Sequence, residues 1–171
     1  MYQVIVNEQW RSISEYINYQ VSNMGRVRNA NTGKILKNQL NTFGYQYVTL
    51  TQEKTRNNHL IHRLVASEFI DNYYNTKYVD HIDRNIRNNI MDNLRWVTNS
   101  ENQMNKTKSN RYTGRYKGVH FDSNRGKFRA RIEKDGTKYN LGSFLTDEEA
   151  ARAYNTKAIE LFGDFACLNV V

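Results

Sequence analysis

Short β-prone runs broken by turn residues dominate the first part of the chain, and they limit it to small antiparallel sheets. Between Trp10 and Gln52 the runs "YQVS", "RVRN", "ILKNQL" and "YQYVTLTQ" alternate with the turn sequences "NMG", "NTGK" and "NTFG". Asn, Gly and Thr favour tight turns, and runs this short pair with their neighbours along the chain. The sequence therefore predicts a small antiparallel β meander, in which basic residues outnumber acidic ones.

Two segments have helical signals. In "HLIHRLVASEFI" (59–70) the apolar residues recur at the spacing of one helix face. In "TDEEAARAYNTKAIELFG" (146–163) Thr146 is a predicted N-cap, three acidic residues occupy the first turn, and Gly163 ends the helix. Both segments are therefore predicted to be amphipathic helices, and the second has an alanine-rich face that can pack on a sheet.

The middle of the chain has a pattern of strand, loop, strand and helix. "YVDHI" and "LRWVT" are predicted strands joined by an Asn-rich loop, and "NSENQMNKTK" is a predicted short helix. Thr98 and Glu101 have the spacing of a capping box at its start. A polar stretch, "KTKSNRYTGR", is a predicted linker. Beyond it, "YKGVHFD", "KFRARIEKDG" and "TKYNLGSF" predict three antiparallel strands.

Charge and composition narrow the class of partner. The 171 residues have a formal net charge of +8, which favours a polyanionic partner such as nucleic acid, an acidic membrane surface or an acidic protein. Twelve Tyr and seven Phe interspersed with the basic residues favour nucleic acid. The single cysteine, Cys167, allows no internal disulfide and no Cys-rich zinc site. We therefore expect a soluble protein in a reducing, intracellular compartment.

Asp80 and His81 are adjacent in the first predicted strand of the middle segment, and together they suit phosphodiester hydrolysis. Histidine titrates near neutral pH and can act as a general base. A hard cation such as Mg²⁺ needs only one or two oxygen ligands from the protein. Asp80 could provide one, and Asn102 or Asn105 of the following helix another. Neighbouring strand residues point to opposite faces, so the strand would have to twist or bulge for both to reach one phosphate.

A surface ion pair is the alternative explanation of an Asp-His pair in a basic protein. The other histidines have less specific interpretations. His59 and His62, three apart on the first predicted helix, are expected to pack or to contact phosphate rather than to bind metal. His120, inside a predicted strand, is expected to be structural or to contact DNA.

The string "VDHIDRNIRNNIMDNLRWVTNSENQMN" resembles the HNH motif of phage-type homing endonucleases over 27 consecutive residues. The resemblance implies a ββα-metal fold in which His81 is the general base and Asn93 braces the hairpin loop. It also implies that Asp80 and Asn102 bind one divalent cation, Mg²⁺ or else Mn²⁺, with Asn105 as the alternative helix ligand. Arg84 departs from the glycine commoner in the family, so either the loop has a different shape or Arg84 adds a phosphate contact.

The flanking segments resemble two further families. Trp10, "YQVSNMGRVRN", "TGKILK" and "IHRLVASEFI" resemble the NUMOD4 module. "YKGVHFD", "GKFRARI" and "LGSFLTDEEAARAYNTKAIELFG" resemble an AP2 domain, with Phe128 in place of the usual tryptophan. The resemblances imply an α+β chain with a β-rich module at 1–57, a ββα-metal nuclease domain at 58–108, and an AP2-like three-stranded sheet packed on one helix at 109–171.

The predicted DNA-contacting residues are basic and distributed over all three segments. They are Arg26, Arg28, Lys37, Arg84, Arg115, Lys117, Arg125, Lys127, Arg129 and Arg131. One face of a predicted strand has three basic residues, because Lys127, Arg129 and Arg131 are spaced two apart. Arginine side chains on such a face can form two hydrogen bonds to a guanine base. A solvated polar face is the alternative for this group.

These features together predict a site-specific, metal-dependent endonuclease acting on double-stranded DNA. The resemblance implies nicking or sequential cutting, a monomer on an asymmetric site, and a location in the cytoplasm of a bacterial host, encoded by a phage or mobile element. The alternative is a non-catalytic AP2-type regulator with an inactive HNH scaffold. An RNA-directed protein is a weaker alternative, because A-form helices bury the groove that such a sheet could read.

Overall fold

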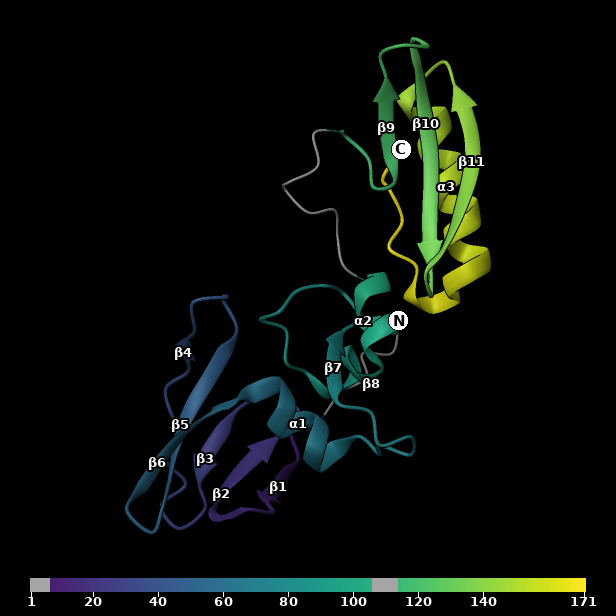
Figure 1. Ribbon diagram of the computed structural model, residues 1–171. Helices are drawn as coiled ribbons and strands as arrows, with labels where there is room; N and C mark the ends of the chain where they lie inside the picture. Colours follow the sequence, from purple (N-terminus) through teal and green to yellow (C-terminus); the bar gives the residue numbers. More distant parts are fainter. Residues whose placement is uncertain (1–6, 106–113) are drawn as a thin grey trace. The chain divides into compact units, whose positions relative to one another are not determined.

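The computed structural model describes residues 7–105 and 114–171, which form two compact units (Figure 1). The first unit ends at Thr98 and the second begins at Asn99. Most of the predicted linker, residues 106–113, lies outside the described residues.

Six strands in the first unit form two separate three-stranded antiparallel sheets instead of the single meander predicted. The first sheet has the order β1-β2-β3 and the second β4-β5-β6. Their bounds are β1 (Trp10–Ile13), β2 (Tyr16–Ser22), β3 (Val27–Asn29), β4 (Gln39–Leu40), β5 (Gln46–Gln52) and β6 (Thr55–Leu60). The prediction of short antiparallel strands is confirmed, but their arrangement in one sheet is wrong.

Strand β6 was not predicted, because its sequence "TRNNHL" is polar and shows no apolar alternation. It forms by pairing with β5 in register from Tyr47 opposite Leu60 to Gln52 opposite Thr55. Glu53 and Lys54 make the connecting turn with φ values of 47° and 68°. The hairpin therefore depends on backbone pairing and a left-handed turn that neither residue type signals.

Helix α1 (Ile61–Phe69) begins directly after β6. The helix prediction is confirmed, but its start is later than the pattern indicated, because Leu60 is still extended at the end of β6. His59 therefore lies on a strand, and its prediction as a helix residue is wrong. Apolar residues of both sheets, of α1 and of the following hairpin form one core: Ile13, Tyr16, Val21, Val27, Val48, Leu50, Ile61, Leu64, Val65 and Leu94.

The predicted hairpin of the middle segment is confirmed as β7 (Tyr78–His81) and β8 (Leu94–Val97), with a short 3-10 helix, η1 (Met91–Asn93), leading into the second strand. Pairing runs without a shift from Tyr78 opposite Val97 to His81 opposite Leu94, so the strand has no bulge at Asp80. Trp96 donates from its indole to the Ile70 carbonyl at 3.0 Å, which ties the hairpin to the end of α1.

The second unit begins with α2 (Asn99–Asn105) and continues as a three-stranded antiparallel sheet of order β11-β10-β9. The strands are β9 (Val119–Asp122), β10 (Lys127–Lys134) and β11 (Thr137–Phe144). They are followed by the helix α3 (Asp147–Phe162) and the 3-10 helix η2 (Gly163–Phe165). All three strands and the long helix were predicted from the sequence. The strand and helix predictions for this unit are therefore confirmed.

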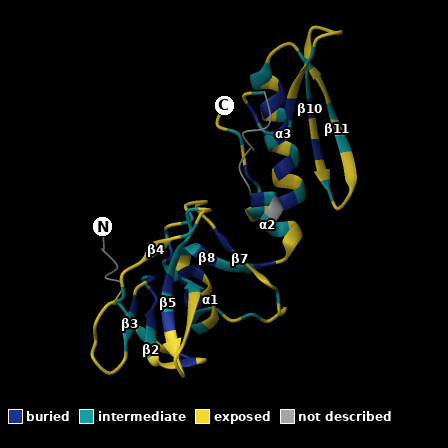
Figure 2. Ribbon diagram, turned by 60° about the vertical axis from the view of Figure 1, so that its left-hand side comes forward, coloured by how far each residue is buried: buried dark blue, intermediate teal, exposed yellow. Residues whose placement is uncertain are grey.

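Helix α3 packs its small and aromatic residues on the sheet, and its remaining surface is partly or fully exposed (Figure 2). Ala130 and Ile132 of β10 are buried against this helix together with Ala150, Tyr154 and Ala158. Thr146 accepts from the Glu149 N–H, and the Glu149 carboxylate accepts from the Thr146 N–H, which completes a capping box. Thr146 is therefore the N-cap of α3, as the sequence predicted.

In the part of the chain that the structure describes, none of the helices has the length and apolar character needed to cross a membrane.

Gly118 provides a test of how closely α3 approaches the sheet. A Cβ added at Gly118 would lie 2.2 Å from the Tyr154 ring and 2.6 Å from the Arg131 carbonyl oxygen, at a φ of +75°. We expect Gly118→Ala to lower the free energy of unfolding by about 2 to 4 kcal/mol, the sum of overpacking and left-handed backbone strain. Urea unfolding of the full chain, followed by amide hydrogen exchange in the second unit, measures this change.

Gly136→Ala is the matched control, because Gly136 has a similar φ of +80° but nothing within 4 Å of an added Cβ. It should show only the backbone strain, roughly 1 to 2 kcal/mol. Equal losses in the two variants would contradict the close packing of Gly118 on Tyr154.

Candidate active site

Asp80 is buried near the end of β7, where the cross-strand partner Arg95 holds it. The Arg95 guanidinium donates from Nε at 3.0 Å and lies 2.9 Å away at Nη2, both to Asp80 Oδ2. Both side chains are largely shielded from water. The ion-pair alternative is thus correct in part, since an ion pair exists, but its partner is an arginine on the neighbouring strand and it is not on the surface.

His81 is also buried and has different neighbours from Asp80. Its Nε2 lies 3.1 Å from Oδ1 of Asn89, which is a loop residue with 4% exposure. The imidazole ring meets the His62 ring edge-on at 5.1 Å between centroids, and the Tyr45 ring lies at 6.2 Å. The ring is therefore enclosed by a side-chain amide and two aromatic groups from three other elements.

His62 extends from α1 into this enclosure and packs between Tyr45 and His81. Burial, together with the smaller effects of the neighbouring His81 and Arg63, lowers the pKa of His62 to about 3. The ring is consequently neutral at physiological pH. Of the two roles expected for His62, the structure places it in packing.

Asn93 joins the two ends of the loop between the strands. Its Oδ1 accepts from the Asp83 N–H at 2.9 Å, and its Nδ2 donates to Asp83 Oδ1 and to the Asn88 carbonyl, both at 2.8 Å. Partial burial would raise the pKa of Asp83, but hydrogen bonds from Asn88, the Asn85 N–H and Asn93 outweigh it and lower that pKa below its usual range. The ionised Asp83 carboxylate therefore accepts hydrogen bonds from three residues of the loop and holds them together.

Arg84 has a φ of +64°, the left-handed conformation that glycine adopts most easily. Its N–H donates to the His81 carbonyl at 2.9 Å, which closes the turn after β7. The sequence left two explanations for arginine in place of glycine at this position, a differently shaped loop or an added phosphate contact. The first is not required, because the backbone keeps the conformation that glycine would adopt. The arginine adopts the left-handed turn itself, and its side chain is exposed.

The two candidate helix ligands, Asn102 and Asn105, both lie on α2 in the second unit. Asn102 is half-buried and Asn105 is buried. Their approach to Asp80 therefore stays a prediction. Among the described residues, there is no group of three or more His, Cys, Asp or Glu side chains that could hold a metal ion.

The predicted DNA-contacting residues of the first unit include two arginines that share one aromatic partner. Arg28 lies 4.1 Å and Arg26 5.7 Å from the Trp10 ring, and Arg26 also forms an ion pair with Glu8. Arg28 donates to the Gln20 amide oxygen at 2.8 Å. Lys37 is exposed between β3 and β4.

In the second unit the predicted residues differ in their surroundings. Arg115 pairs with Glu148 at 3.0 Å, and Lys117 donates from Nζ to the Met104 carbonyl at 3.0 Å. Arg129 lies 3.6 Å from the Asp122 carboxylate. Arg125, Lys127 and Arg131 are exposed.

Four residues of the site were missed in the sequence: Tyr45, Gln46, Asn89 and Arg95. Asn89 also donates from Nδ2 to Gln46 Oε1 at 2.7 Å. The Asn-rich loop gave a weak signal for Asn89, but nothing distinguished it from Asn85 or Asn88. Tyr45 and Gln46 lie at the start of a predicted strand and gave no sign of a role at His81.

Comparison with known proteins gives two family matches along the first unit and α2. The NUMOD4 motif matches residues 8–51, and the HNH endonuclease family matches residues 59–104.

Individual relatives agree with these matches. DNA endonuclease I-HmuI of Bacillus phage SP01 is 42% identical over 102 residues, which are 57% of this chain and 59% of that protein. The H-N-H endonuclease F-TflII of Escherichia phage T5 is 32% identical over 58% of this chain and 53% of its own length. The chain thus spans less than two thirds of these two relatives.

A solved structure concerned with DNA binding and cleavage by the HNH homing endonuclease I-HmuI is also similar. It has a TM-score of 0.52 and 29% identity, covering 90% of this chain and 91% of that one. YosQ of Bacillus subtilis strain 168, a protein derived from the SPbeta prophage and assigned to the HNH homing endonucleases, is 33% identical over 71% of each chain. The chain therefore belongs to the HNH homing endonuclease family.

Proposed function

We propose that this protein is a divalent-metal-dependent endonuclease that hydrolyses a phosphodiester bond at a specific site in double-stranded DNA. One observation carries the proposal. Asp80 and His81 are buried side by side at the end of β7, and each is held by a polar partner, in a chain of this family. Two such costly groups in one small unit are better explained by chemistry than by folding stability.

His81 is the proposed general base. A neutral imidazole can accept a proton from water, and the contacts with Asn89 and His62 restrict the rotation of this ring. A fixed imidazole positioned beside the scissile phosphate would take the proton as the water oxygen attacks phosphorus. The leaving 3′ oxygen must then be stabilised by another group.

Asp80 is a suitable ligand for a hard divalent cation, because its donor atoms are carboxylate oxygens. The described part of the chain offers no cluster of three acidic, histidine or cysteine ligands, so a closed site of the zinc type does not fit. A hard cation such as Mg²⁺, which keeps waters and takes one or two protein oxygens, does fit a single carboxylate with an amide from α2. When bound there, it would offset charge on the phosphate and on the leaving oxygen.

Arg95 has a positioning role in this scheme. Its Nε and Nη2 both approach Oδ2 of Asp80, and this restrains the position of that carboxylate oxygen. Asn102 is the proposed amide ligand and Asn105 the alternative. Asn93 is proposed to keep the loop, and with it the end of β7, in one shape through its three hydrogen bonds.

DNA is the proposed partner, and the names of the relatives support it. I-HmuI is called a DNA endonuclease, and its solved structure concerns DNA binding and cleavage. In this chain the sheet face with Lys127, Arg129 and Arg131 is the proposed reader, and the opposite side of β10 is buried on α3. This unit is proposed to act like an AP2 domain, with Phe128 packed on Phe121 at 5.0 Å where the family has tryptophan.

The remaining basic residues are proposed to contact phosphates. Arg26, Arg28 and Lys37 serve the first unit, Arg84 the loop, and Arg115, Lys117 and Arg125 the second unit. Because the two units differ in fold, a monomer could recognise an asymmetric site. One catalytic centre would then cut one strand at a time, in the cytoplasm of a bacterial host.

The catalytic assignment is tested by replacing His81 and Asp80. His81→Ala should lower the single-turnover cleavage rate at saturating DNA by about 10² to 10⁴-fold, since a general base contributes that much. Asp80→Ala should be at least as damaging, because it removes the proposed cation ligand. The Kd for DNA, measured by gel shift in Ca²⁺, should change little in either variant.

Two matched controls accompany this experiment. His120→Ala removes an exposed imidazole from β9, and Asp71→Ala removes an exposed carboxylate that accepts a hydrogen bond from the Tyr73 hydroxyl. Both should retain the parental rate at saturating DNA. Cleavage by His81→Ala at the parental rate would refute the assignment of the base.

The dependence on metal separates an endonuclease from a pure DNA-binding protein. Mg²⁺ should convert supercoiled plasmid containing the target region to the nicked form, and excess EDTA should stop the reaction while binding persists. A plasmid that stays closed with Mg²⁺ and with Mn²⁺ would instead support the non-catalytic regulator.

The proposed reading face is tested by its effect on salt dependence. Arg131→Ala should reduce the slope of log Kd against log salt by about 0.9, the value for one neutralised phosphate. Lys134, on the same strand, donates from Nζ to the Leu161 carbonyl at 2.8 Å and is the control. Lys134→Ala should leave the slope unchanged, and equal slopes in all three proteins would exclude this face as the DNA contact.

A further inference from the structure

The contact between Asn89 and His81 determines which ring nitrogen bears the hydrogen. Asn89 Oδ1, 3.1 Å from His81 Nε2, is a carbonyl oxygen and can only accept. The other end of the Asn89 amide donates to Gln46 Oε1 at 2.7 Å, which sets its orientation. With the two amides oriented in this way, His81 donates from Nε2, and the lone pair of the neutral ring lies on Nδ1.

Asn89 is held in place by the turn between β2 and β3, which belongs to the β-rich first part of the chain. Gly25 in this turn has a φ of +77°, and a Cβ added there would lie 2.8 Å from Asn89 Cβ and 3.0 Å from the Asn89 carbonyl oxygen. The Met91 N–H donates to the Asn23 carbonyl at 2.8 Å. The turn thus contacts the loop on both sides of Ile90.

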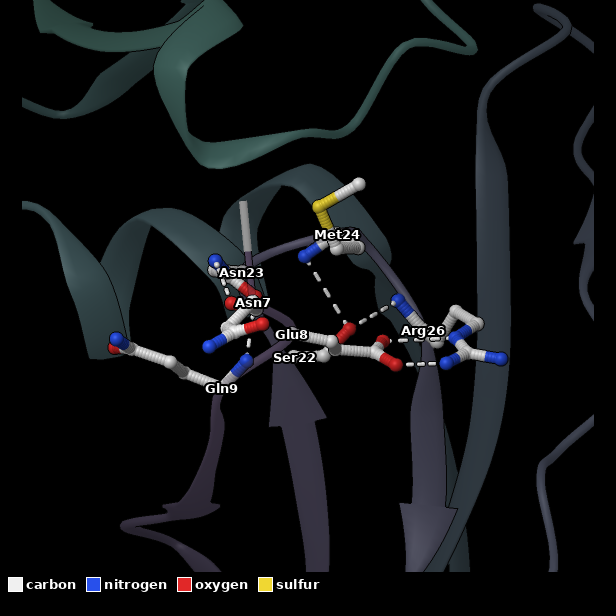
Figure 3. Close-up of polar contacts among 7 residues, drawn as sticks. All are labelled: Asn7, Glu8, Gln9, Ser22, Asn23, Met24 and Arg26. Carbon is white, nitrogen blue, oxygen red and sulfur yellow. Dashed lines mark hydrogen bonds and ion pairs between the residues drawn. The ribbon is translucent and has the colours of Figure 1, made fainter. Parts of the chain in front are cut away.

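The turn itself is fixed by buried polar groups, as Figure 3 shows. Ser22 Oγ accepts from the N–H groups of Met24 and Arg26 at 3.3 and 3.1 Å. Asn23 exchanges hydrogen bonds with the segment before β1, accepting from the Gln9 N–H at 2.8 Å through its side chain. Ser22 and Asn23 are themselves buried and make these hydrogen bonds, so the turn has little freedom to move.

We propose that Asn89 is a positioning residue that selects the Nε2–H form of His81, and that the turn around Gly25 is what holds Asn89 in place. The inference rests on the proposed role of His81 as the base. It gives the β-rich part of the chain a second task besides DNA contact, because its turn and Gln46 determine which nitrogen of His81 can receive a proton.

A purely structural role is the competing explanation, in which Asn89 only packs the loop. The two explanations differ in one property of the ring. If Asn89 selects the tautomer, its removal changes the distribution of hydrogen between Nε2 and Nδ1. If it only packs the loop, the distribution stays the same while stability falls.

The first experiment measures the tautomer of His81 by long-range ¹H–¹⁵N NMR on the full chain, without DNA or metal, at a pH well above the ordinary pKa of histidine. The chain has four histidines, and the His81 signal is identified by its loss in His81→Ala. The parental protein should show the Nε2–H pattern. An Nδ1–H pattern would overturn the proposal.

Three variants then test the chain of contacts. Asn89→Ala should lose the single-tautomer pattern. Asn89→Asp should retain it, because a carboxylate still accepts from Nε2. Gly25→Ala should resemble Asn89→Ala although it has no contact with the imidazole, and an unchanged His81 pattern in both alanine variants would overturn the proposal.

Cleavage gives an independent measurement. Asn89→Ala and Gly25→Ala should lower the single-turnover rate about 10- to 100-fold, as for other residues that orient a catalytic group, at an unchanged Kd for DNA. Asn89→Asp should recover most of this rate. A parental rate in Asn89→Ala would contradict the positioning role.

Asn72→Ala is the matched control. Asn72 also braces a loop of the first unit, accepting from the Thr76 N–H at 2.8 Å and donating to its carbonyl at 2.8 Å. Its loss should cost stability without changing the His81 pattern or the rate, and a change of the pattern would overturn the proposal. Failure of the parental protein to cut DNA would count against the proposed function alone, since the NMR result requires no cleavage.

Discussion

Burial of an aspartate and a histidine next to each other is the constraint on which the first unit depends. A buried polar group without a partner costs several kcal/mol in a protein whose total stability is of the order of 10 kcal/mol. Arg95 gives Asp80 a partner from the paired strand, and Asn89 gives His81 a partner from the loop. The hairpin, the loop and the elements that hold the loop must therefore form together.

This coupling explains why the β-rich segment and the hairpin share one core. Val21, Val27 and Val48 from the two sheets pack with Leu64 of α1 and Leu94 of β8. The turn at Gly25 and the residue Gln46 then extend from this core to Asn89. In physical terms, the NUMOD4 region and the β7–β8 hairpin with its loop share one folding unit, because they share this core and because the Asn89 amide finds its acceptor, Gln46, in the NUMOD4 region.

The sequence was sufficient wherever local signals determine structure. The β7–β8 hairpin, the three strands of the second unit and α3 with its capping box follow from alternation, turn residues and caps, which act over a few residues. Strand β6 could not be predicted, because it is polar and forms only by pairing with β5. His59 was misplaced on α1 for the same reason.

The candidate site was predictable in part. The adjacent Asp80 and His81 were recognised by their chemistry and by resemblance. Asn89 and Gln46 were not, because they are 43 positions apart and meet only in the folded chain. The role of Gly25 was not predictable for the same reason. The sequence shows only that Gly25 lies in a turn, whereas the atoms that leave no room for a side chain there belong to Asn89, far along the chain.

The count of 25 lysines and arginines overstates the number of cations available to a polyanion, because several arginines already have carboxylate partners. Arg26 pairs with Glu8, Arg115 with Glu148, and Arg129 lies 3.6 Å from Asp122. Exposed pairs of this kind cost little to exchange, so they do not prevent a phosphate from binding. However, a nearby carboxylate partly cancels the cation at longer range, so these residues should contribute more to orientation than to attraction. Long-range attraction would then depend mainly on exposed cations such as Lys127 and Arg131.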